Sequence, residues 1–199
     1  MSPERLIRYK EVSVNARTIG PRGDRAHLAS TKTLILERQD IARAVKRMAH
    51  EVVEKNRGVD SLVVVGIEKG GTWIARDLAL ELTRIENSDT SFFSLDVGNF
   101  RDDVPRTRFE RDFRPWEMVE DKTILLCDDV LYTGRTVRAA FDALAQFGRP
   151  ASVQLAVLID RGHREFPIRA DYVGKNVPTS REEFVRVSEN QVEIERAKG

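Results

Sequence analysis

The sequence predicts a single α/β domain built on a mostly parallel sheet flanked by helices. Short apolar runs such as SLVVVG (61–66) are typical of strands that are buried on both faces of a sheet. These runs alternate along the chain with segments of helical periodicity. Strands that alternate with helices form parallel sheets through right-handed crossovers. A chain of 199 residues is long enough for one substantial core and short for two domains.

The first 30 residues are expected to form an N-terminal extension, partly ordered, ahead of the folded domain at 31–199. They combine scattered arginines with Gly20, Pro21 and Gly23, and they show little periodicity, as is common at chain ends. Only the segment IRYKEVSVNA (7–16) has a pattern that is compatible with a short strand.

The first half of the domain contains two predicted helices and two predicted strands. The first helix begins near Gln39 and ends at Gly58, since glycine commonly terminates helices. The strand at 61–66 follows, then a second helix, then a strand at SFFSLD (91–96). The apolar residues at helical spacing are Ile41, Val45, Met48, Ala49 and Val52 in the first helix and Ile74, Leu78, Leu82 and Ile85 in the second.

The second half repeats the alternation after a charged stretch at 99–114. That stretch is too polar for a core and too long for a connector, which indicates a mobile lid. A strand at ILLC (124–127) precedes a third helix that stops at Gly148, and a further strand follows at VQLAVLI (153–159). The apolar residues of this third helix are Val137, Ala140, Phe141, Leu144 and Phe147.

Composition and end sequences predict a cytoplasmic protein that does not enter a membrane. The 33 basic and 32 acidic side chains give a formal net charge of +1, which leaves nucleic-acid binding open because a local patch matters more than the total. The single cysteine, Cys127, cannot form an internal disulfide, which indicates a reducing compartment. No apolar run approaches the roughly 18–20 residues that span a bilayer, and the amino terminus lacks the apolar segment of a signal peptide.

Two adjacent carboxylates, Asp128 and Asp129, stand directly after the ILLC strand. Ligands of open α/β sheets bind beyond the carboxyl ends of the strands. The turn 132–136 opens the third helix and offers backbone N–H groups and threonine hydroxyls to a phosphate. The carboxylates would accept hydrogen bonds from two vicinal ribose hydroxyls. The alternative is a solvated strand end followed by an N-capped helix.

The run ILLCDDVLYTGRT (124–136) resembles the signature for phosphoribosyl diphosphate (PRPP) of type I phosphoribosyltransferases. DDVLYTGRTVRAAFDAL and GRPASVQLAVLIDRGHREFPIRADYVGKNVPTS are similar nearly residue for residue to the bifunctional pyrimidine operon attenuation protein/uracil phosphoribosyltransferase family, the PyrR family. The resemblance covers roughly residues 34–195. It implies the type I fold, with a small hood and a mobile lid. The residues implied to bind PRPP or nucleotide are Asp128, Asp129, Val130, Leu131, Tyr132, Thr133, Gly134, Arg135 and Thr136.

The resemblance implies the transfer of ribose 5-phosphate from PRPP to uracil, which gives UMP and pyrophosphate. Asp128, Asp129 and Arg101 are the implied catalytic residues; Arg101 lies in the lid segment FRDD (100–103). Carboxylates would oppose the positive charge that develops on the ribose ring. Mg²⁺ is expected to arrive with the diphosphate, bound mainly by substrate oxygens and water, so no metal ligands are expected from the protein.

Two further loops are assigned by the resemblance. The turn GIEKGG (66–71) is expected to hold the pyrophosphate through Glu68, Lys69, Gly70 and Gly71. Relatives usually carry Thr-Arg-Gly there, whereas Lys-Gly-Gly is more similar to hypoxanthine-guanine transferases.

A tyrosine at position 132 offers no base for a purine at neutral pH, which favours a pyrimidine. The implied base-binding residues of the hood are Asp160, Arg161, Tyr172 and Val173, although Tyr172 and Val173 would also suit core packing.

The family resemblance also implies binding to the leader messenger RNA of a pyrimidine operon. Arg47 and His50, three residues apart, share a face of the first helix. Basic side chains of this kind contact phosphates and unpaired bases, although a solvated, salt-bridged surface has the same composition. The implied RNA-binding residues are Arg47, His50, His163, Arg164, Arg169 and Lys175. Family members form dimers and tetramers, so a homodimer or homotetramer is expected.

Three hypotheses remain open from the sequence. The first is a pyrimidine-operon regulator with uracil phosphoribosyltransferase activity. The second is an RNA-binding regulator that has lost its enzyme activity, because the pyrophosphate loop and lid depart from the family pattern. The third is a purine salvage enzyme, because of the Lys-Gly-Gly sequence at 69–71. Product formation from PRPP with uracil or hypoxanthine distinguishes them.

Overall fold

The structure, a computed structural model, describes residues 30–100 and 119–197. The expected N-terminal extension, the catalytic candidate Arg101 and nearly all of the expected lid lie outside these residues. Those three expectations therefore stay predictions. The division into an extension and a domain is likewise a sequence prediction.

The central sheet has five strands, and every pair of neighbours in it is parallel. This confirms the parallel α/β class. The sheet contains each strand that the sequence predicted and adds an edge strand, β6. In spatial order the strands are β3 (Phe92–Leu95), β2 (Leu62–Ile67), β4 (Thr123–Leu131), β5 (Ser152–Asp160) and β6 (Tyr172–Asn176).

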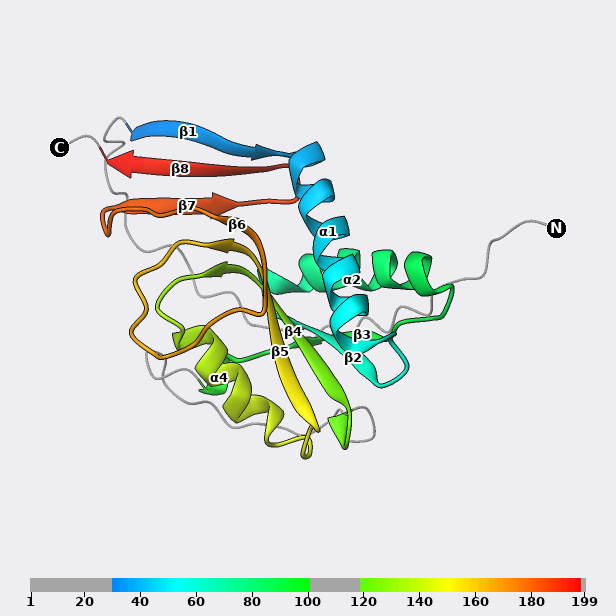
Figure 1. Cartoon of the computed structure of the whole chain (residues 1–199). Helices are drawn as coiled ribbons and strands as arrows, with labels where there is room; N and C mark the ends of the chain where they lie inside the picture. Colours follow the sequence, from blue (N-terminus) through cyan, green and yellow to red (C-terminus); the bar gives the residue numbers. More distant parts are fainter. Residues whose placement is uncertain (1–29, 101–118, 198–199) are drawn as a thin grey trace, which may run out of the picture.

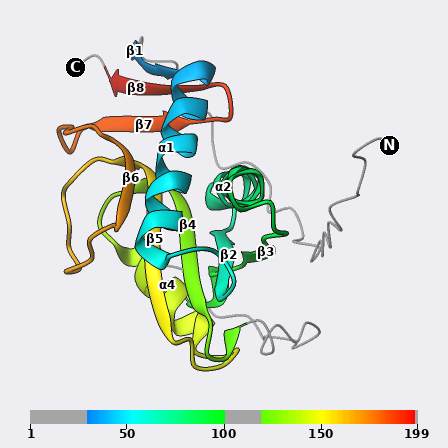
Figure 2. The same ribbon diagram turned by 45° about the vertical axis from the view of Figure 1, so that its right-hand side comes forward.

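Helices cover both faces of the central sheet (Figures 1 and 2). One core cluster joins α1 (Arg38–Asn56) and α2 (Gly71–Glu86) to the sheet. A second cluster lies under α4 (Arg135–Leu144), and a short 3₁₀ helix, η1 (Gly98–Phe100), follows β3. All five apolar residues predicted to line the first helix are buried. The periodicity argument therefore identified the correct face.

The start and end of α1 explain why the helix has these limits. Glu37 and Asp40 form a reciprocal capping box at its beginning. At its end Arg57 takes a left-handed conformation, and Gly58 (φ +120°) donates its N–H to the carbonyl of Val53 at 3.1 Å. The predicted stop at Gly58 is confirmed.

The strand predicted at 124–127 is longer in the structure. β4 continues through the two aspartates to Leu131, because β5 pairs with it as far as the Leu131–Asp160 register. Its pairing with β2 ends at Cys127. The aspartates therefore lie within the strand, in the section that extends past its neighbour β2, rather than after the strand's end.

The third helix is shorter than predicted. α4 ends at Leu144, so Phe147 lies beyond it, packed against the second core cluster. Phe141, which was predicted to face the core, is 41% exposed. The helical spacing was correct, but the apolar stripe of this helix is narrower than the sequence pattern indicated.

A second sheet of three antiparallel strands lies beside the start of α1 (Figure 1). It contains β1 (Ser30–Glu37), β8 (Gln191–Ala197) and β7 (Glu183–Val187), so both ends of the described chain contribute to it. The hood was expected to come from the segment after the last strand, including residues 171–174. That segment instead forms most of β6, at the edge of the central sheet. A local sequence pattern could not predict that β1 pairs with β8, because the two strands are far apart in the chain.

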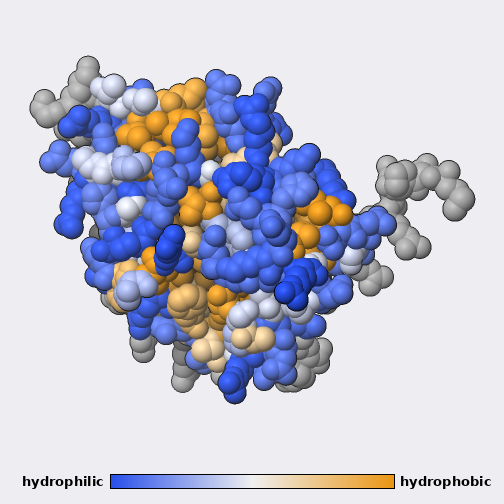
Figure 3. Space-filling view, in the orientation of Figure 1, coloured by the Kyte–Doolittle hydropathy of each residue, from blue (hydrophilic) through white to orange (hydrophobic). Residues whose placement is uncertain are grey.

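The second sheet leaves apolar side chains in contact with solvent. Leu34 is 49% exposed and Phe184 is 55% exposed. Figure 3 shows apolar surface over this sheet, surrounded by polar residues. Ion pairs between Lys32 and Glu193 and between Arg186 and Glu195 cross its strands.

Candidate active site

The carboxylate pair lies where β4 extends past β2. Asp128 is 6% exposed, and its Oδ1 accepts a hydrogen bond from the backbone N–H of Asp129 at 3.0 Å. Asp129 Oδ1 accepts one from the N–H of Val130 at 2.7 Å. Burial raises the pKa of the Asp129 carboxyl, and the Val130 hydrogen bond offsets part of this effect. The site holds a desolvated carboxylate, which attracts a developing positive charge more strongly than a solvated one.

The turn before α2 packs directly on this pair. A Cβ atom at Gly70 would lie 2.3 Å from the Asp129 carboxyl, and one at Gly71 would lie 2.1 Å from the Cys127 carbonyl oxygen. Only glycines allow an approach this close. The predicted pyrophosphate loop and the predicted ribose-binding carboxylates therefore come together, although they are far apart in the sequence.

Two charged residues of the same turn face solvent. Glu68 and Lys69 are exposed, and a cis peptide bond joins them. Partial desolvation of the Glu68 carboxyl and the nearby negative charge of Asp96 raise the pKa of Glu68. Asp96 follows β3, so acidic groups stand at the carboxyl ends of three adjacent strands. Among the described residues, however, no group of three or more His, Cys, Asp or Glu is arranged to hold a metal.

The predicted phosphate-binding turn connects β4 to α4. Gly134 lies there with φ +90°, and Arg135 begins the helix. A Cβ at Gly134 would lie 3.3 Å from Phe166 and from Ile168. Glycine is thus required by the backbone conformation and by this neighbouring segment, in addition to any need for close approach by a phosphate.

Tyr132 is enclosed by two basic side chains. The Arg161 guanidinium lies 4.2 Å from the centre of the Tyr132 ring, in cation–π geometry. His163 meets the same ring edge-on at 5.8 Å. Arg161 is only 6% exposed, and it donates to Thr179 Oγ1 and to the carbonyl oxygens of Ser180 and Glu183. Arg161 therefore connects the segment 179–183, which leads into β7, to Tyr132 in the turn after β4.

The four residues predicted to bind the base have different environments. Asp160 ends β5, and its Oδ2 accepts a hydrogen bond from Arg164 at 2.5 Å. Val173 is half-buried against the second core cluster. Tyr172 is 3% exposed, and its hydroxyl donates to Gln154 at 2.7 Å. The environment of the Tyr172 side chain fits the alternative of core packing, because its ring is enclosed in the core and its hydroxyl is already paired.

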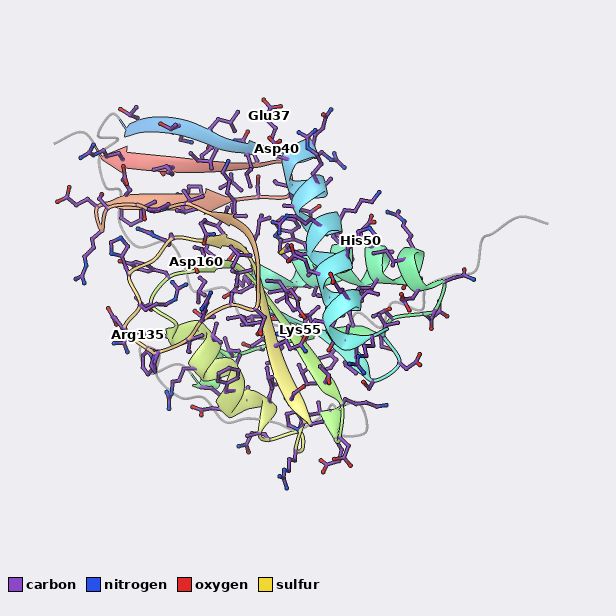
Figure 4. All side chains as sticks on the ribbon, viewed as in Figure 1. Glu37, Asp40, His50, Lys55, Arg135 and Asp160 are labelled. Atoms are coloured by element: carbon purple, nitrogen blue, oxygen red, sulfur yellow. The ribbon has the colours of Figure 1, made fainter. Side chains whose placement is uncertain are left out.

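The six predicted RNA-binding residues come from three parts of the fold: α1, β6 and the connection between β5 and β6. Arg47 on α1 donates to the carbonyls of Val173 and Gly174 on β6, both at 2.8 Å, and Lys175 follows on that strand. His50 is exposed on α1, well away from Arg135 and Asp160 (Figure 4). The remaining three, His163, Arg164 and Arg169, lie in the connection between β5 and β6.

Within this connection the three residues differ in their contacts. Arg169 is exposed. Nε2 of His163 lies 2.5 Å from the carbonyl of Thr179, and Arg164 donates to the carbonyls of Leu131 and Tyr132. His163 and Arg164 thus contact the nucleotide site itself. No local sequence pattern predicted these contacts, because the hydrogen bonds join residues from different loops.

The fold and the site define a phosphoribosyltransferase. The family model described as "Phosphoribosyl transferase domain" matches residues 32–191. Among solved structures, the hypoxanthine phosphoribosyltransferase of Staphylococcus aureus superimposes with a TM-score of 0.60 at 26% identity, over 77% of this chain and 80% of that one. The corresponding enzyme of Trypanosoma cruzi gives a TM-score of 0.63 at 21% identity, over 83% of this chain and 97% of that one, and supports the fold alone.

The chain belongs to the PyrR family. It is 49% identical over 160 residues to the bifunctional protein PyrR of Clostridioides difficile, covering 79% of this chain and 90% of that one. It is 50% identical over 163 residues to the bifunctional protein PyrR of a Geobacter species, covering 78% and 90%. These relatives are far closer than the hypoxanthine enzymes, so the purine alternative is not favoured. No helix in the described ranges is long and apolar enough to cross a bilayer.

Proposed function

We propose that this PyrR-family chain regulates pyrimidine biosynthetic operons by UMP-dependent binding to leader messenger RNA, and that it converts uracil and PRPP to UMP and pyrophosphate. The observation that carries the enzymatic half is the contact between Gly70 and the Asp129 carboxyl. It brings a helix N-terminus suited to pyrophosphate against the carboxylates suited to ribose. The turn at 132–136 supplies the third part, a site for the 5′-phosphate.

In the proposed reaction the bond between ribose C1′ and the pyrophosphate oxygen breaks as N1 of uracil bonds to C1′, and the proton from N1 passes to the departing pyrophosphate or to water. Asp128 and Asp129 accept hydrogen bonds from the ribose hydroxyls and oppose the positive charge that develops on the ring. Both carboxylates are held by backbone N–H groups or burial before substrate binds, so little reorganisation is needed. The side chain of Arg101 is proposed to act from the lid.

Mg²⁺ is the proposed cofactor, entering with PRPP. Substrate oxygens and water would supply its ligands, and the carboxylate oxygens of Asp128 and Asp129 would accept hydrogen bonds from its bound waters. The ion would neutralise charge on the departing pyrophosphate. Lys69 adds a positive charge beside the same group, as a point charge rather than as the two-pronged donor that arginine provides.

RNA binding is proposed for the surface that joins α1 to β6. Arg47, His50 and Lys175 contribute to it, and Arg169 is exposed on the adjoining connection. The surface of one subunit is small, so we propose a homodimer or homotetramer as the RNA-binding form. The proposed compartment is the cytoplasm, where PRPP and nascent messenger RNA occur.

The enzymatic half is tested by incubating the protein with Mg²⁺, PRPP and either uracil, hypoxanthine or guanine. UMP and pyrophosphate should form from uracil, and neither purine should be converted. Purine turnover above uracil turnover would contradict the pyrimidine assignment. No turnover with any base, combined with RNA binding that responds to UMP, would instead support the regulator that has lost its enzyme activity.

A further inference from the structure

The segment 164–168 lies against the phosphate-binding turn and holds its carbonyl groups. Arg164 Nη1 donates to the carbonyl oxygens of Leu131 and Tyr132 at 3.2 and 2.8 Å. The backbone N–H groups of Glu165 and Phe166 donate to the carbonyl oxygen of Thr133 at 2.9 and 3.0 Å. Three consecutive carbonyls at the start of the turn are thus directed towards one segment.

This arrangement fixes the direction of the N–H groups as well. In a trans peptide unit the C=O and the following N–H point to opposite sides, and among the described residues the only cis bond is between Glu68 and Lys69. The N–H groups of Tyr132, Thr133 and Gly134 therefore point away from the segment 164–168. That is the side on which an incoming phosphate can meet them.

The guanidinium of Arg164 is almost fully engaged in holding this geometry. Besides the two carbonyls of the turn, Nη1 reaches the carbonyl of Gly162 at 3.1 Å and Nε donates to that of Ile168 at 3.0 Å. Nη2 pairs with Asp160 at 2.5 Å, and the side chain is 22% exposed. A guanidinium has five N–H donors. These five contacts leave at most one N–H, on Nη2, for a further partner.

Contacts of the next residues strengthen the same junction. Glu165 pairs with Arg135, with Nε and Nη2 at 2.9 and 2.8 Å from its Oε2. The Arg135 guanidinium lies 5.3 Å from the Phe166 ring centre. The first residue of α4 is therefore tied to the same segment as the carbonyls that precede it.

We propose that Arg164 is a positioning residue for the 5′-phosphate site: it holds the turn 131–134 so that its N–H groups face the nucleotide. This rests on the proposed phosphoribosyltransferase function. It reassigns a residue that family resemblance places among RNA contacts, because its donors are used within the protein. Loss of Arg164 weakens RNA binding through the nucleotide site, and therefore chiefly the part of RNA binding that UMP promotes.

The test exploits the fact that UMP and pyrophosphate occupy different parts of the site. UMP places its phosphate on the turn at 132–136, whereas pyrophosphate binds at the turn before α2. Arg164→Ala and Arg164→Lys are compared with Arg186→Ala, which removes an exposed arginine that is likewise paired with a carboxylate, Glu195. UMP binding is measured by calorimetry, pyrophosphate by product inhibition, and folding by thermal unfolding.

Arg164→Ala should raise the dissociation constant of UMP about tenfold or more, as expected for the loss of hydrogen bonds that hold the turn. The inhibition constant of pyrophosphate should change less than about threefold, and the KM for PRPP should rise more than kcat falls. Arg164→Lys should restore little of the UMP affinity. The three N–H donors of a lysine share one nitrogen, so they cannot reach both the carbonyls of the turn and those of the segment 162–168. Arg186→Ala should change neither constant.

Unchanged UMP affinity in a folded Arg164→Ala protein with weakened RNA binding would overturn the proposal and make Arg164 an RNA contact only. Equal loss of UMP and pyrophosphate binding would also overturn it, because the defect would then be general. If the alanine variant does not fold, the lysine variant decides by the same criteria. UMP calorimetry needs no turnover, so wild-type protein that binds UMP but forms none contradicts the proposed enzyme activity alone.

Discussion

The buried carboxylate of Asp129 suits catalysis but lowers the stability of the ligand-free protein. Burial raises its pKa in the folded state above the ordinary value of 3.8. The protonated form therefore favours folding, and this stabilisation is lost as the pH rises through the folded pKa. At neutral pH the ionised carboxylate is desolvated without a bound cation or ribose to compensate it.

We predict that Asp129→Asn lowers uracil turnover by about 100-fold or more, as when one electrostatic group is lost from an active site. The same change should raise the melting temperature of the ligand-free protein at neutral pH, because an amide oxygen can still accept the Val130 hydrogen bond without carrying charge. The stability advantage over wild type should grow as the pH rises above 3.8. Steady-state kinetics and thermal unfolding at several pH values measure both effects; a variant that is less stable at neutral pH would contradict the burial argument.

Gly70 lies so close to the Asp129 carboxyl that no side chain fits at this position. Gly70→Ala should lower turnover about tenfold or more, since a Cβ 2.3 Å from the Asp129 carboxyl displaces the loop or the carboxylate. Gly98→Ala is the matched control, because its nearest neighbour would be the end of the Asp96 side chain at 3.1 Å. If both variants retain wild-type kinetics, the turn does not pack on the catalytic carboxylate as described.

Contacts between elements decide which basic residues remain available for RNA. Arg47 lies on α1, yet it donates to two carbonyls of β6 and pairs with Glu51 at 2.6 Å. It therefore secures an edge strand to a helix. His50, on the same helix, is exposed.

We predict that Arg47→Ala lowers the free energy of unfolding by about 0.5–1.5 kcal/mol, because α1 loses its exposed hydrogen bonds to β6. It should weaken RNA binding as well. His50→Ala should weaken RNA binding with no change in stability. Urea unfolding and gel shifts on both variants measure these effects. Equal stability of the two variants would show that the Arg47 contact with β6 contributes nothing, and that the residue is free to serve RNA alone.

In the whole molecule, the connection between β5 and β6 links the proposed nucleotide site to the proposed RNA-binding surface. The residues between β5 and β6 include Arg161, His163 and Arg164, which contact the nucleotide turn, and the exposed Arg169. If UMP strengthens RNA binding, then RNA must strengthen UMP binding by the same factor.

We predict that the operon's own leader RNA binds more tightly when UMP is present, and that its affinity falls as salt rises, with a slope that reflects the phosphates neutralised. Gel shifts with and without UMP at several salt concentrations measure both effects, and calorimetry of UMP with and without RNA checks the reciprocal effect. A leader with a scrambled hairpin is the control. Absence of binding in every condition would leave uracil transfer as the only function.

The sequence by itself determined the parallel sheet, its helices and the positions of the nucleotide-binding turns, because each of these depends on local signals. Buried strands have continuous apolar runs, helices have their own period, and the Gly-Gly sequence at 70–71 marks the turn that opens a helix. Family resemblance then added the chemistry. Each predicted helix and strand that lies in the described residues has the predicted type, whereas the ends of β4 and α4 shifted by several residues because neighbouring strands and packing set them.

Only the tertiary structure decided which polar side chains already have hydrogen-bond partners within the protein. Tyr172, Arg47 and Arg164 have ordinary sequence contexts, and their partners come from distant segments. The second sheet depends in the same way on the pairing of Ser30–Glu37 with Gln191–Ala197, at opposite ends of the described chain. A sequence pattern records what each segment prefers, while the availability of a donor or a face depends on what folds against it. That is why the sequence could predict a nucleotide site at 128–136 but could not predict the hydrogen bonds that Arg161 and Arg164 make around it.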